Sequence, residues 1–174
     1  VTSLGAVFKG QSIIRTFNEL YYFTGLTDIS DDAFNGCTLM TSLRLPKTLN
    51  IIGKRSFKGC IRLTTLSLPT GVNAIGAEAF SGCKALKDIV LPSEIKAIEA
   101  GTFFNCQQLQ DIELPISVLS IGDSALAGCT KLTQLTLRTF SPQAISLGVN
   151  VFKRRVLFRS MCSKAAIPMQ LHCQ

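Results

Sequence analysis

Apolar residues return along this chain at a fixed interval, the one that separates Cys37 from Cys60. Cysteine, phenylalanine, isoleucine and proline each keep their own place within that interval. The rows are Cys37, Cys60, Cys83, Cys106 and Cys129; Phe34, Phe57, Phe80 and Phe103, with Leu126 in fifth place; Ile52, Ile75, Ile98 and Ile121; and Pro46, Pro69, Pro92 and Pro115. Because one such unit is too small to bury its apolar residues alone, the rows predict stacked coils that cover one another.

The unit that runs from Cys60 to Gly82, CIRLTTLSLPTGVNAIGAEAFSG, predicts the path of each coil. Leu66 and Leu68 alternate with polar residues, which is typical of a short strand. Pro69 ends that strand because it has no N–H to donate to a neighbouring strand. The Thr-Gly pair that follows predicts a turn, and the later apolar residues of the unit return to the interior.

The motif L-x-x-L-x-L-P, followed by I-G-x-x-A-F-x-G-C, recurs along the chain, and the resemblance that it carries covers roughly residues 1–152. It resembles the leucine-rich repeat family, and within it the BspA-like class, also called the Treponema pallidum type. The resemblance implies an α/β-class repeat solenoid, a right-handed superhelix with short parallel strands, one in each 23-residue coil. Little helix is expected, limited to turns around the A-F element and to the segment Asn18–Phe23.

The two ends of the chain depart from the repeat. Phe8 precedes Phe34 by a longer interval than the later phenylalanines keep, so residues 1–33 are expected to form a longer N-terminal cap coil and residues 34–152 the repeats. Residues 153–174 lack the motif and are expected to form an irregular basic C-terminal end. Within that end, the segment Val156–Phe158 is a candidate for a last strand.

Seven cysteines raise the question of a disulfide or metal framework. Five of them occupy one equivalent position, which predicts a row of buried thiols acting as small apolar groups. Their side chains would be parallel, an unsuitable geometry for disulfides. The remaining soft ligands, Cys162, His172 and Cys173, lack the short paired spacings of a zinc site. We therefore expect no metal and no cofactor.

No catalytic constellation stands out. The one histidine is His172, and the sequence contains no nucleophile elbow, P-loop or dinucleotide-binding glycine motif. The carboxylates Asp88, Asp111 and Glu113 fall at outward strand positions, where nothing would desolvate them for acid–base work. We expect a protein that is not an enzyme.

The outward strand positions are the best candidates for binding. The first of them is occupied by Ser42, Thr65, Asp88, Asp111 and Gln134, and the second by Arg44, Ser67, Val90, Glu113 and Thr136. In a leucine-rich repeat, such positions share one concave face. That face is expected to change from basic at Arg44 and Lys47 to acidic at Asp88, Asp111 and Glu113. These five charged residues are the candidate binding residues, and Asp88 is expected to lie beside Asp111.

Composition excludes several classes of protein. With 47% hydrophobic and 17% charged residues, the chain is too apolar to be disordered, and no stretch is long and apolar enough for a membrane span. The net charge of +7 suggests nucleic acid, but Lys153, Arg154, Arg155, Arg159 and Lys164 hold +5 of it. This tail has no groove for a partner, so neither nucleic-acid binding nor membrane insertion is expected.

By resemblance, the chain is expected to be a non-enzymatic protein-binding module of a bacterial surface or secreted protein, and adhesion to host or matrix proteins is one role open to it. The alternative is a structural spacer within a longer repeat array, with no ligand of its own. No signal-peptide pattern is present in the chain. Many thiols without an evident disulfide pattern leave a cytoplasmic location open.

Overall fold

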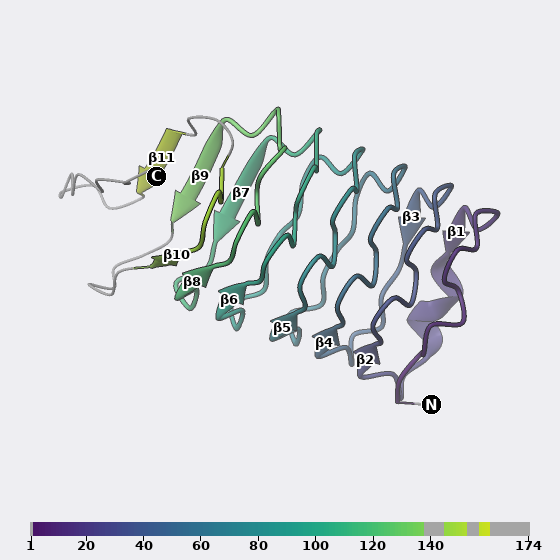
Figure 1. The fold of residues 1–174 in the computed structure, drawn as a ribbon. Coiled ribbons are helices and arrows are strands. Elements are labelled where there is room, and N and C mark those ends of the chain that lie inside the picture. Colours follow the sequence, from purple (N-terminus) through teal and green to yellow (C-terminus); the bar gives the residue numbers. More distant parts are fainter. Residues whose placement is uncertain (1, 138–144, 153–156, 161–174) are drawn as a thin grey trace.

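The structure is a computed structural model, and it describes residues 2–137, 145–152 and 157–160. The chain winds into a solenoid with β1 at one end of the stack and β9 and β11 at the other (Figure 1). The elements are β1 Thr16–Phe17, η1 Asn18–Tyr22, β2 Asp28–Ile29, β3 Ser42–Leu43, β4 Ile51–Ile52, β5 Ala74–Ile75, β6 Ala97–Ile98, β7 Asp111–Leu114, β8 Ser120–Ile121, β9 Gln134–Leu137, β10 Ser146–Leu147 and β11 Leu157–Ser160.

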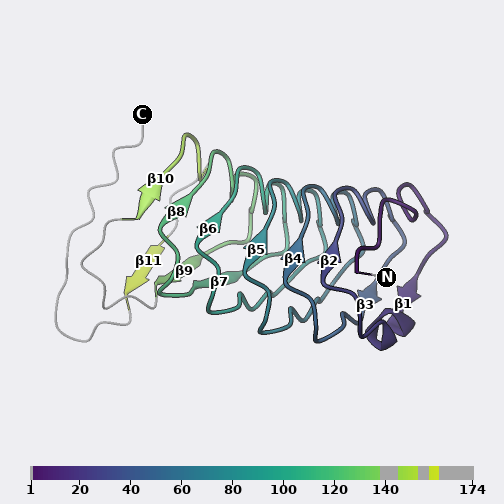
Figure 2. The ribbon, with the colours of Figure 1, turned by 90° about the horizontal axis from the view of Figure 1, so that it is seen from below.

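The strands are parallel and form two rows along the stack (Figures 1 and 2). The first strand row contains β1, β3, β7, β9 and β11, together with the isolated bridges Thr65↔Asp88 and Val90↔Glu113. The second strand row contains β2, β4, β5, β6, β8 and β10. The predicted short parallel strands are thus confirmed. The second row consists of further two-residue strands, each of which ends in isoleucine or, in β10, leucine.

The only helix among the described residues is the 3-10 helix η1, which falls within the segment expected to be helical. The A-F segments form turns instead. Their backbone N–H groups donate to the following coil, as from Phe57 to the Ala79 carbonyl at 2.8 Å and from Phe80 to the Thr102 carbonyl at 2.9 Å. In the second strand row the bonds run the other way, as from Gly76 N–H to the Ile52 carbonyl. Each inner coil is therefore hydrogen-bonded to both neighbours.

The interior is built from the repeating apolar rows. The rings of Phe34, Phe57, Phe80 and Phe103 are fully buried and form a continuous stack, with centroids 5.4–5.5 Å apart and planes within 7° of parallel. Phe8 of the first coil extends the stack to Phe34 at 5.3 Å. The predicted core rows are therefore the observed core.

Close contact between coils explains the glycines that follow Ile52, Ile75 and Ile121, whereas Glu99 follows Ile98. At Gly76, an added Cβ would lie 2.6 Å from the backbone nitrogen of Lys54 in the preceding coil. Real Cβ atoms do not approach so closely, so the backbone path at Gly76 requires glycine. This contact supports the second strand row.

The two ends follow the sequence only in part. The candidate strand at Val156–Phe158 is present as β11, which pairs with β9 in parallel register. The other residues of the basic end lie outside the described residues, among them Val156, Cys162, His172 and Cys173. The division into a cap, repeats and a basic end remains a prediction.

Candidate functional site

The outward side chains of the first strand row form the candidate surface. Along it, Thr65, Ser67, Asp88 and Asp111 are exposed, and Val90 is 81% exposed. Leucines and isoleucines between these positions point inward and are buried, as expected for alternation along a strand. The row therefore presents residues of different chemistry over a uniform apolar layer.

Thr136 departs from the expectation for this row. It was expected to point outward, but it is only 7% exposed and accepts a hydrogen bond from Gln134 Nε2 at 3.0 Å. The parallel register places Glu113 on one side of Thr136 and Arg159 on the other. Flanking strands on both sides account for its burial, so the second outward position of β9 is not accessible, while Gln134 at the first is partly exposed.

The acidic half of the row contains Asp88, Asp111 and Glu113. The pairing Val90↔Glu113 continues the offset of one repeat unit, so Asp88 lies beside Asp111 on the neighbouring coil. Both carboxylates are exposed, and neither has a salt bridge in the described part of the chain. Two like charges at adjacent strand positions are mildly destabilising, which leaves a site attractive to a cationic group.

The basic half contains Arg44 and Lys47. The guanidinium carbon of Arg44 lies 3.9 Å from the ring centroid of Tyr21, a cation–π contact. Tyr21 comes from η1, which follows β1, while Arg44 follows β3 and β1 pairs with β3. The helix of the first coil thus places an aromatic ring against an arginine of the next coil.

Beside this contact is an open groove with a volume of about 490 Å³. Its lining consists of Tyr21, Leu43, Arg44, Leu45, Lys47, Ser67, Leu68, Pro69 and Thr70. Ligand pockets commonly fall within about 300–1,000 Å³, so this groove has the capacity of a small ligand or a few amino-acid side chains. It brings together two of the five candidate residues, Arg44 and Lys47, while Asp88, Asp111 and Glu113 lie outside it.

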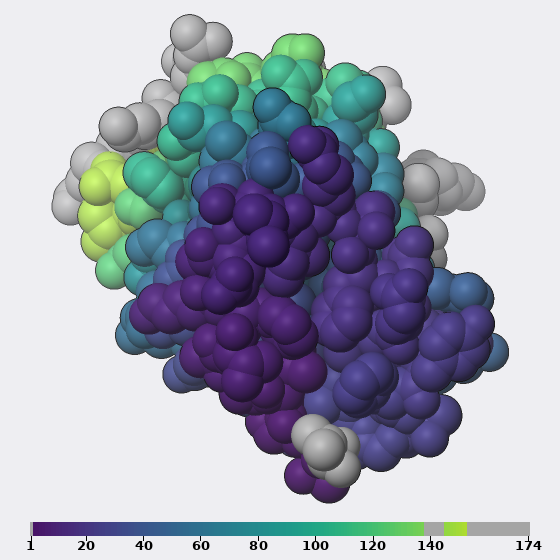
Figure 3. All heavy atoms as spheres, turned by 90° about the vertical axis from the view of Figure 1, so that its right-hand side faces the viewer, coloured from purple at the N-terminus to yellow at the C-terminus, as the bar shows by residue number. Residues whose placement is uncertain are grey.

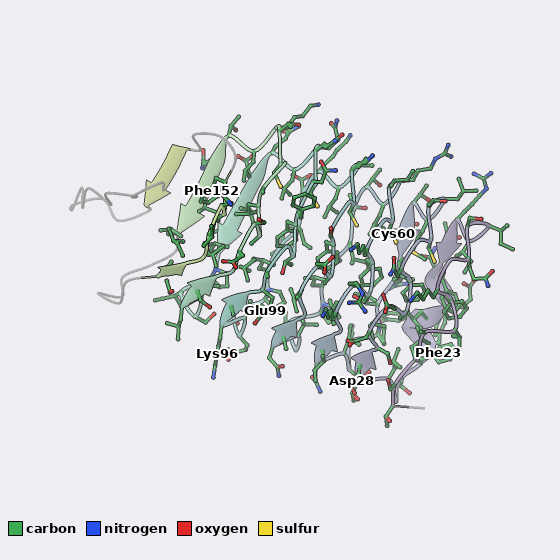
Figure 4. The ribbon with its side chains drawn as sticks, viewed as in Figure 1. Phe23, Asp28, Cys60, Lys96, Glu99 and Phe152 are labelled. Atoms are coloured by element: carbon green, nitrogen blue, oxygen red, sulfur yellow. The ribbon has the colours of Figure 1, made fainter. Side chains whose placement is uncertain are left out.

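Tyr21 is a candidate binding residue that sequence reasoning missed. The signal available was the run of Tyr21, Tyr22 and Phe23, three aromatics at a place where the repeat has none. Tyr22 is 74% exposed, and Phe23 is labelled in Figure 4 at the N-terminal end, near η1. Of these three aromatics Tyr21 lines the groove, and aromatic side chains are enriched at binding surfaces.

The cysteines of the repeat form a row that is buried from Cys37 to Cys106 and partly buried at Cys129, and burial disfavours their thiolate form. All five described cysteines are free, and their sulfurs recur from coil to coil (Figure 4, with Cys60 labelled). Each thiol donates to the carbonyl of a phenylalanine, as Cys83 Sγ does to Phe57 at 3.2 Å. Burial raises the pKa of the Cys83 thiol well above its ordinary value, and that of Cys129 to about 12. The predicted structural thiols are confirmed.

A second charged cluster lies at the turn edge of the stack, away from the first strand row. Asp32 accepts two hydrogen bonds from Arg55, at 3.0 and 2.8 Å, and one from Asn35 at 2.6 Å. The bonds from Arg55 and then from Asn35 hold the pKa of the Asp32 carboxyl well below its usual range. Lys9 Nζ is 3.5 Å from the same carboxylate. These groups satisfy one another, so the cluster is structural.

Within residues 2–137 and 145–152, no group of three or more histidine, cysteine, aspartate or glutamate side chains is placed to hold a metal ion. In the same part of the chain, no helix has the length and apolar character needed to span a membrane. The exposed side chains of the first strand row can form hydrogen bonds, ion pairs and apolar contacts.

Comparison with known proteins identifies the repeat. The family model of the BspA type leucine rich repeat region matches residues 27–157, in six copies. No curated protein matches the chain. Solved structures similar to it include a leucine rich repeat protein of T. pallidum, TpLRR; a leucine-rich repeat protein from Bacteroides ovatus; and the pneumococcal vaccine antigen PcpA.

TpLRR is 29% identical to this chain with a TM-score of 0.60, and the match covers 72% of this chain and 68% of TpLRR. The B. ovatus protein is 24% identical with a TM-score of 0.52, and coverage is 92% of this chain and 59% of that one. PcpA is 24% identical with a TM-score of 0.57, and coverage is 78% and 33%. The chain thus spans about three fifths of the B. ovatus protein and one third of PcpA, and these two likenesses concern the fold alone.

Proposed function

Because this chain belongs to the BspA-type leucine-rich repeat family, we propose that it is a non-enzymatic protein-binding module that uses the outward side chains of its first strand row. The observation that carries the proposal is the contrast between a repeated interior and a varied exterior. The buried phenylalanines recur once in every coil from Phe34 to Phe103, whereas the outward positions hold Arg44, Val90 and Asp111. Repeat folds bind proteins through such extended surfaces.

The charges on the row divide it into two parts with different partners. Arg44 and Lys47 suit an acidic part of a protein ligand, and Asp88 and Asp111, with Glu113 beside them, suit a basic part. Strands about 4.8 Å apart place Asp88 two coils, on the order of 10 Å, from the coil of Arg44. A single protein ligand with charges of both signs could contact both parts at once, and Val90 would add apolar contact between them.

We place this module in a bacterial surface or secreted protein that adheres to a host or matrix protein. The family and the fold similarity to TpLRR support a bacterial repeat protein. One structural relative is a pneumococcal vaccine antigen, which supports a surface location. The free thiols are compatible with such a location because burial, rather than a reducing compartment, keeps them apart from oxidants.

The test is binding of the full chain to an array of immobilised matrix proteins and bacterial surface proteins, at low and high salt. A specific partner should be retained at high salt, since apolar contact at Val90 supplements charge. Asp88→Lys or Asp111→Lys should weaken that binding by about tenfold or more, because each variant places a cation opposite the basic part of the ligand.

Glu99→Lys is the matched control. It makes the same change of charge at an exposed site beside the second strand row, where Figure 4 labels Glu99. It should change the affinity less than about twofold. An equal loss in all three variants would assign the binding to net charge and contradict the proposed surface. Binding to no protein of the array would favour the spacer alternative.

A further inference from the structure

We propose that the groove between η1 and the coils of β3 and Pro69 binds a peptide segment in which an acidic side chain stands next to an apolar one. The groove is lined by two cations, two hydroxyl-bearing side chains, one aromatic ring and four apolar residues, and by no carboxylate. The inference deepens the proposed protein-binding function and rests on it, since it assigns a ligand chemistry to one end of the first strand row.

The first support is an arginine held ready for a carboxylate. Arg44 lies over the face of Tyr21 at 3.9 Å, and it makes no salt bridge to any carboxylate of the described residues. A guanidinium stacked on a ring keeps the N–H groups at its edge available, and two of them match the two oxygens of a carboxylate. Because the ring already restricts the arginine, binding loses less side-chain entropy.

The second support is a further positive charge on the same groove, that of Lys47, which also lacks an acidic partner in the described part of the chain. The positive charge of Arg44 and Lys47 is therefore not neutralised locally. Ser67 and Thr70 lie on the lining from the next coil, and both are exposed. Their hydroxyls are available to hydrogen-bond the backbone or carboxylate of a bound segment.

The third support is the apolar floor. Leu43, Leu45 and Leu68 are core residues whose outer atoms reach the groove, and Pro69 adjoins them. An apolar side chain of the ligand would cover these atoms and remove more apolar surface from water. Charge alone would need no such floor, so the combination indicates a ligand with an acidic and an apolar group side by side.

The rest of the row argues against a long polyanion such as a sulfated glycan. Asp88 and Asp111 lie farther along the same row, on the order of 10–15 Å from the coil of Arg44 at the usual strand spacing. A polyanion that extended from the groove along the row would meet these exposed carboxylates and be repelled. A short acidic segment avoids them, and a basic residue later in the same peptide would be attracted by them.

The experiment is a titration of the full ¹⁵N-labelled chain with the probe peptide acetyl-Leu-Asp-Leu-Glu-amide, followed by NMR. Its uncharged twin, acetyl-Leu-Asn-Leu-Gln-amide, and a heparin tetrasaccharide are titrated in parallel. We expect the acidic peptide to shift the amide signals of Tyr21, Arg44, Lys47, Ser67 and Thr70, and the uncharged twin to bind at least about tenfold more weakly.

Arg44→Gln should weaken binding of the acidic peptide about tenfold or more, because it removes the guanidinium group that pairs with the carboxylate. The matched control is Arg62→Gln, at an exposed arginine that does not line the groove, and it should change the affinity less than about twofold. Tyr21→Phe should bind like the parent chain because the ring remains. Tyr21→Leu should bind the acidic peptide more weakly, since Arg44 loses its cation–π contact. The leucine side chain still fills the half-buried position.

Three results would overturn the inference: equal affinity for the acidic peptide and its uncharged twin, tighter binding of the heparin tetrasaccharide than of the peptide, or no loss in Arg44→Gln. The second result would assign the groove to anionic glycans. If the chain binds a protein of the array in an Asp88-dependent way but not the peptide, only the inference fails. If it binds neither, the proposed function fails as well.

Discussion

The first coil and the inner coils contain the same kinds of residue but hold them in different surroundings. Phe80, in an inner coil, stacks on Phe57 and Phe103 at 5.5 Å on each side and is fully buried. Phe8, in the first coil, stacks on Phe34 alone, meets Phe17 edge to face at 5.1 Å, and is only partly buried. In the described part of the chain, the first coil has a neighbour on one side only.

The surface at that end reflects the difference. Figure 3 looks onto the N-terminal end, where first-coil atoms, in purple, form much of the face. Ile13 is 79% exposed there, and Tyr22 in η1 is 74% exposed. The contribution of a side chain to the free energy of unfolding therefore depends on how many coils contact it, as expected when stability is a sum over neighbouring repeats. The first coil also contributes Tyr21 to the groove.

The largest expected effect comes from the aromatic stack. Phe80→Ala should lower the free energy of unfolding by about 3–5 kcal/mol, because it opens a cavity between two buried rings. Phe8→Ala should cost about half as much, since one face of its ring lacks a stacked partner. Urea unfolding of both variants measures the two values, with unchanged slopes as the control for two-state behaviour. Equal losses would contradict the comparison, and a loss below about 1 kcal/mol at Phe80 would mean the core is misplaced.

The next effect concerns the ion pair that ties the end of the first coil to the second. Asp32→Asn should cost about 1–2 kcal/mol at pH 7, because the carboxylate accepts two bonds from the partly exposed Arg55. The folded-state pKa of Asp32 is lowered, so its stabilisation is present above an unfolded pKa of about 4 and is lost as the pH falls below it. The difference between the free energies of unfolding at pH 7 and at pH 3 should thus be smaller in Asp32→Asn than in the parent chain. Asp88→Asn, at an exposed carboxylate, is the control and should cost less than about 0.5 kcal/mol.

A smaller effect should appear where an inner coil contains a polar defect. Ser56 is fully buried, and its hydroxyl has no hydrogen-bond partner among the described residues. Ala33, Ala79 and Ala125 occupy the same position in other coils, and Thr102 there donates to the Glu99 carbonyl at 2.8 Å. Ser56→Ala should raise the free energy of unfolding by about 1 kcal/mol, because an unpaired buried hydroxyl is removed. Thermal or urea unfolding checks the gain. A loss in Ser56→Ala would show that the hydroxyl is paired in solution.

The smallest effect concerns the backbone of a turn in a later coil. Ser124 has a φ of +54°, in a row where the preceding coil has Gly101 at +63°. Ser124→Gly should raise the free energy of unfolding by about 0.5 kcal/mol. The free energy gained by removing the left-handed strain exceeds the free energy lost to the larger conformational entropy of the unfolded chain. Ser93→Gly, at an exposed site without positive φ, should lower stability by a similar amount. Urea unfolding measures both changes, and the same sign in both variants would contradict the strain argument.

Much of the fold was predictable because equivalent positions in successive coils contact one another and so require the same kind of residue at a fixed interval. The phenylalanine stack requires one ring per coil, and the contact at Gly76 leaves no room for a side chain. The second strand row was harder to predict, since Ala74-Ile75 is too short to carry an alternating pattern. The burial of Thr136 also escaped prediction, because it depends on β11, which comes later in the chain and pairs with the strand of Thr136.

The candidate site was predictable only in its charges. Outward strand positions pointed to Arg44, Asp88 and Asp111, and the register of the coils places the two aspartates side by side. The stacking of Arg44 on Tyr21 was not predictable, because the two residues belong to different coils and Tyr21 lies in a helix that interrupts the repeat. The groove volume likewise depends on side chains from three successive coils.

The coil length, the buried rows, the row of cysteine thiols and the order of charges along the first strand row all follow from the amino-acid sequence alone. Each of them depends on a residue that contacts its equivalent in the next coil, so it recurs at a fixed interval. The contact of Tyr21 with Arg44 and the groove without carboxylates beside it are visible only once the coils are folded together. The reason is that the groove arises where the first coil departs from the repeat, so no interval encodes its contacts.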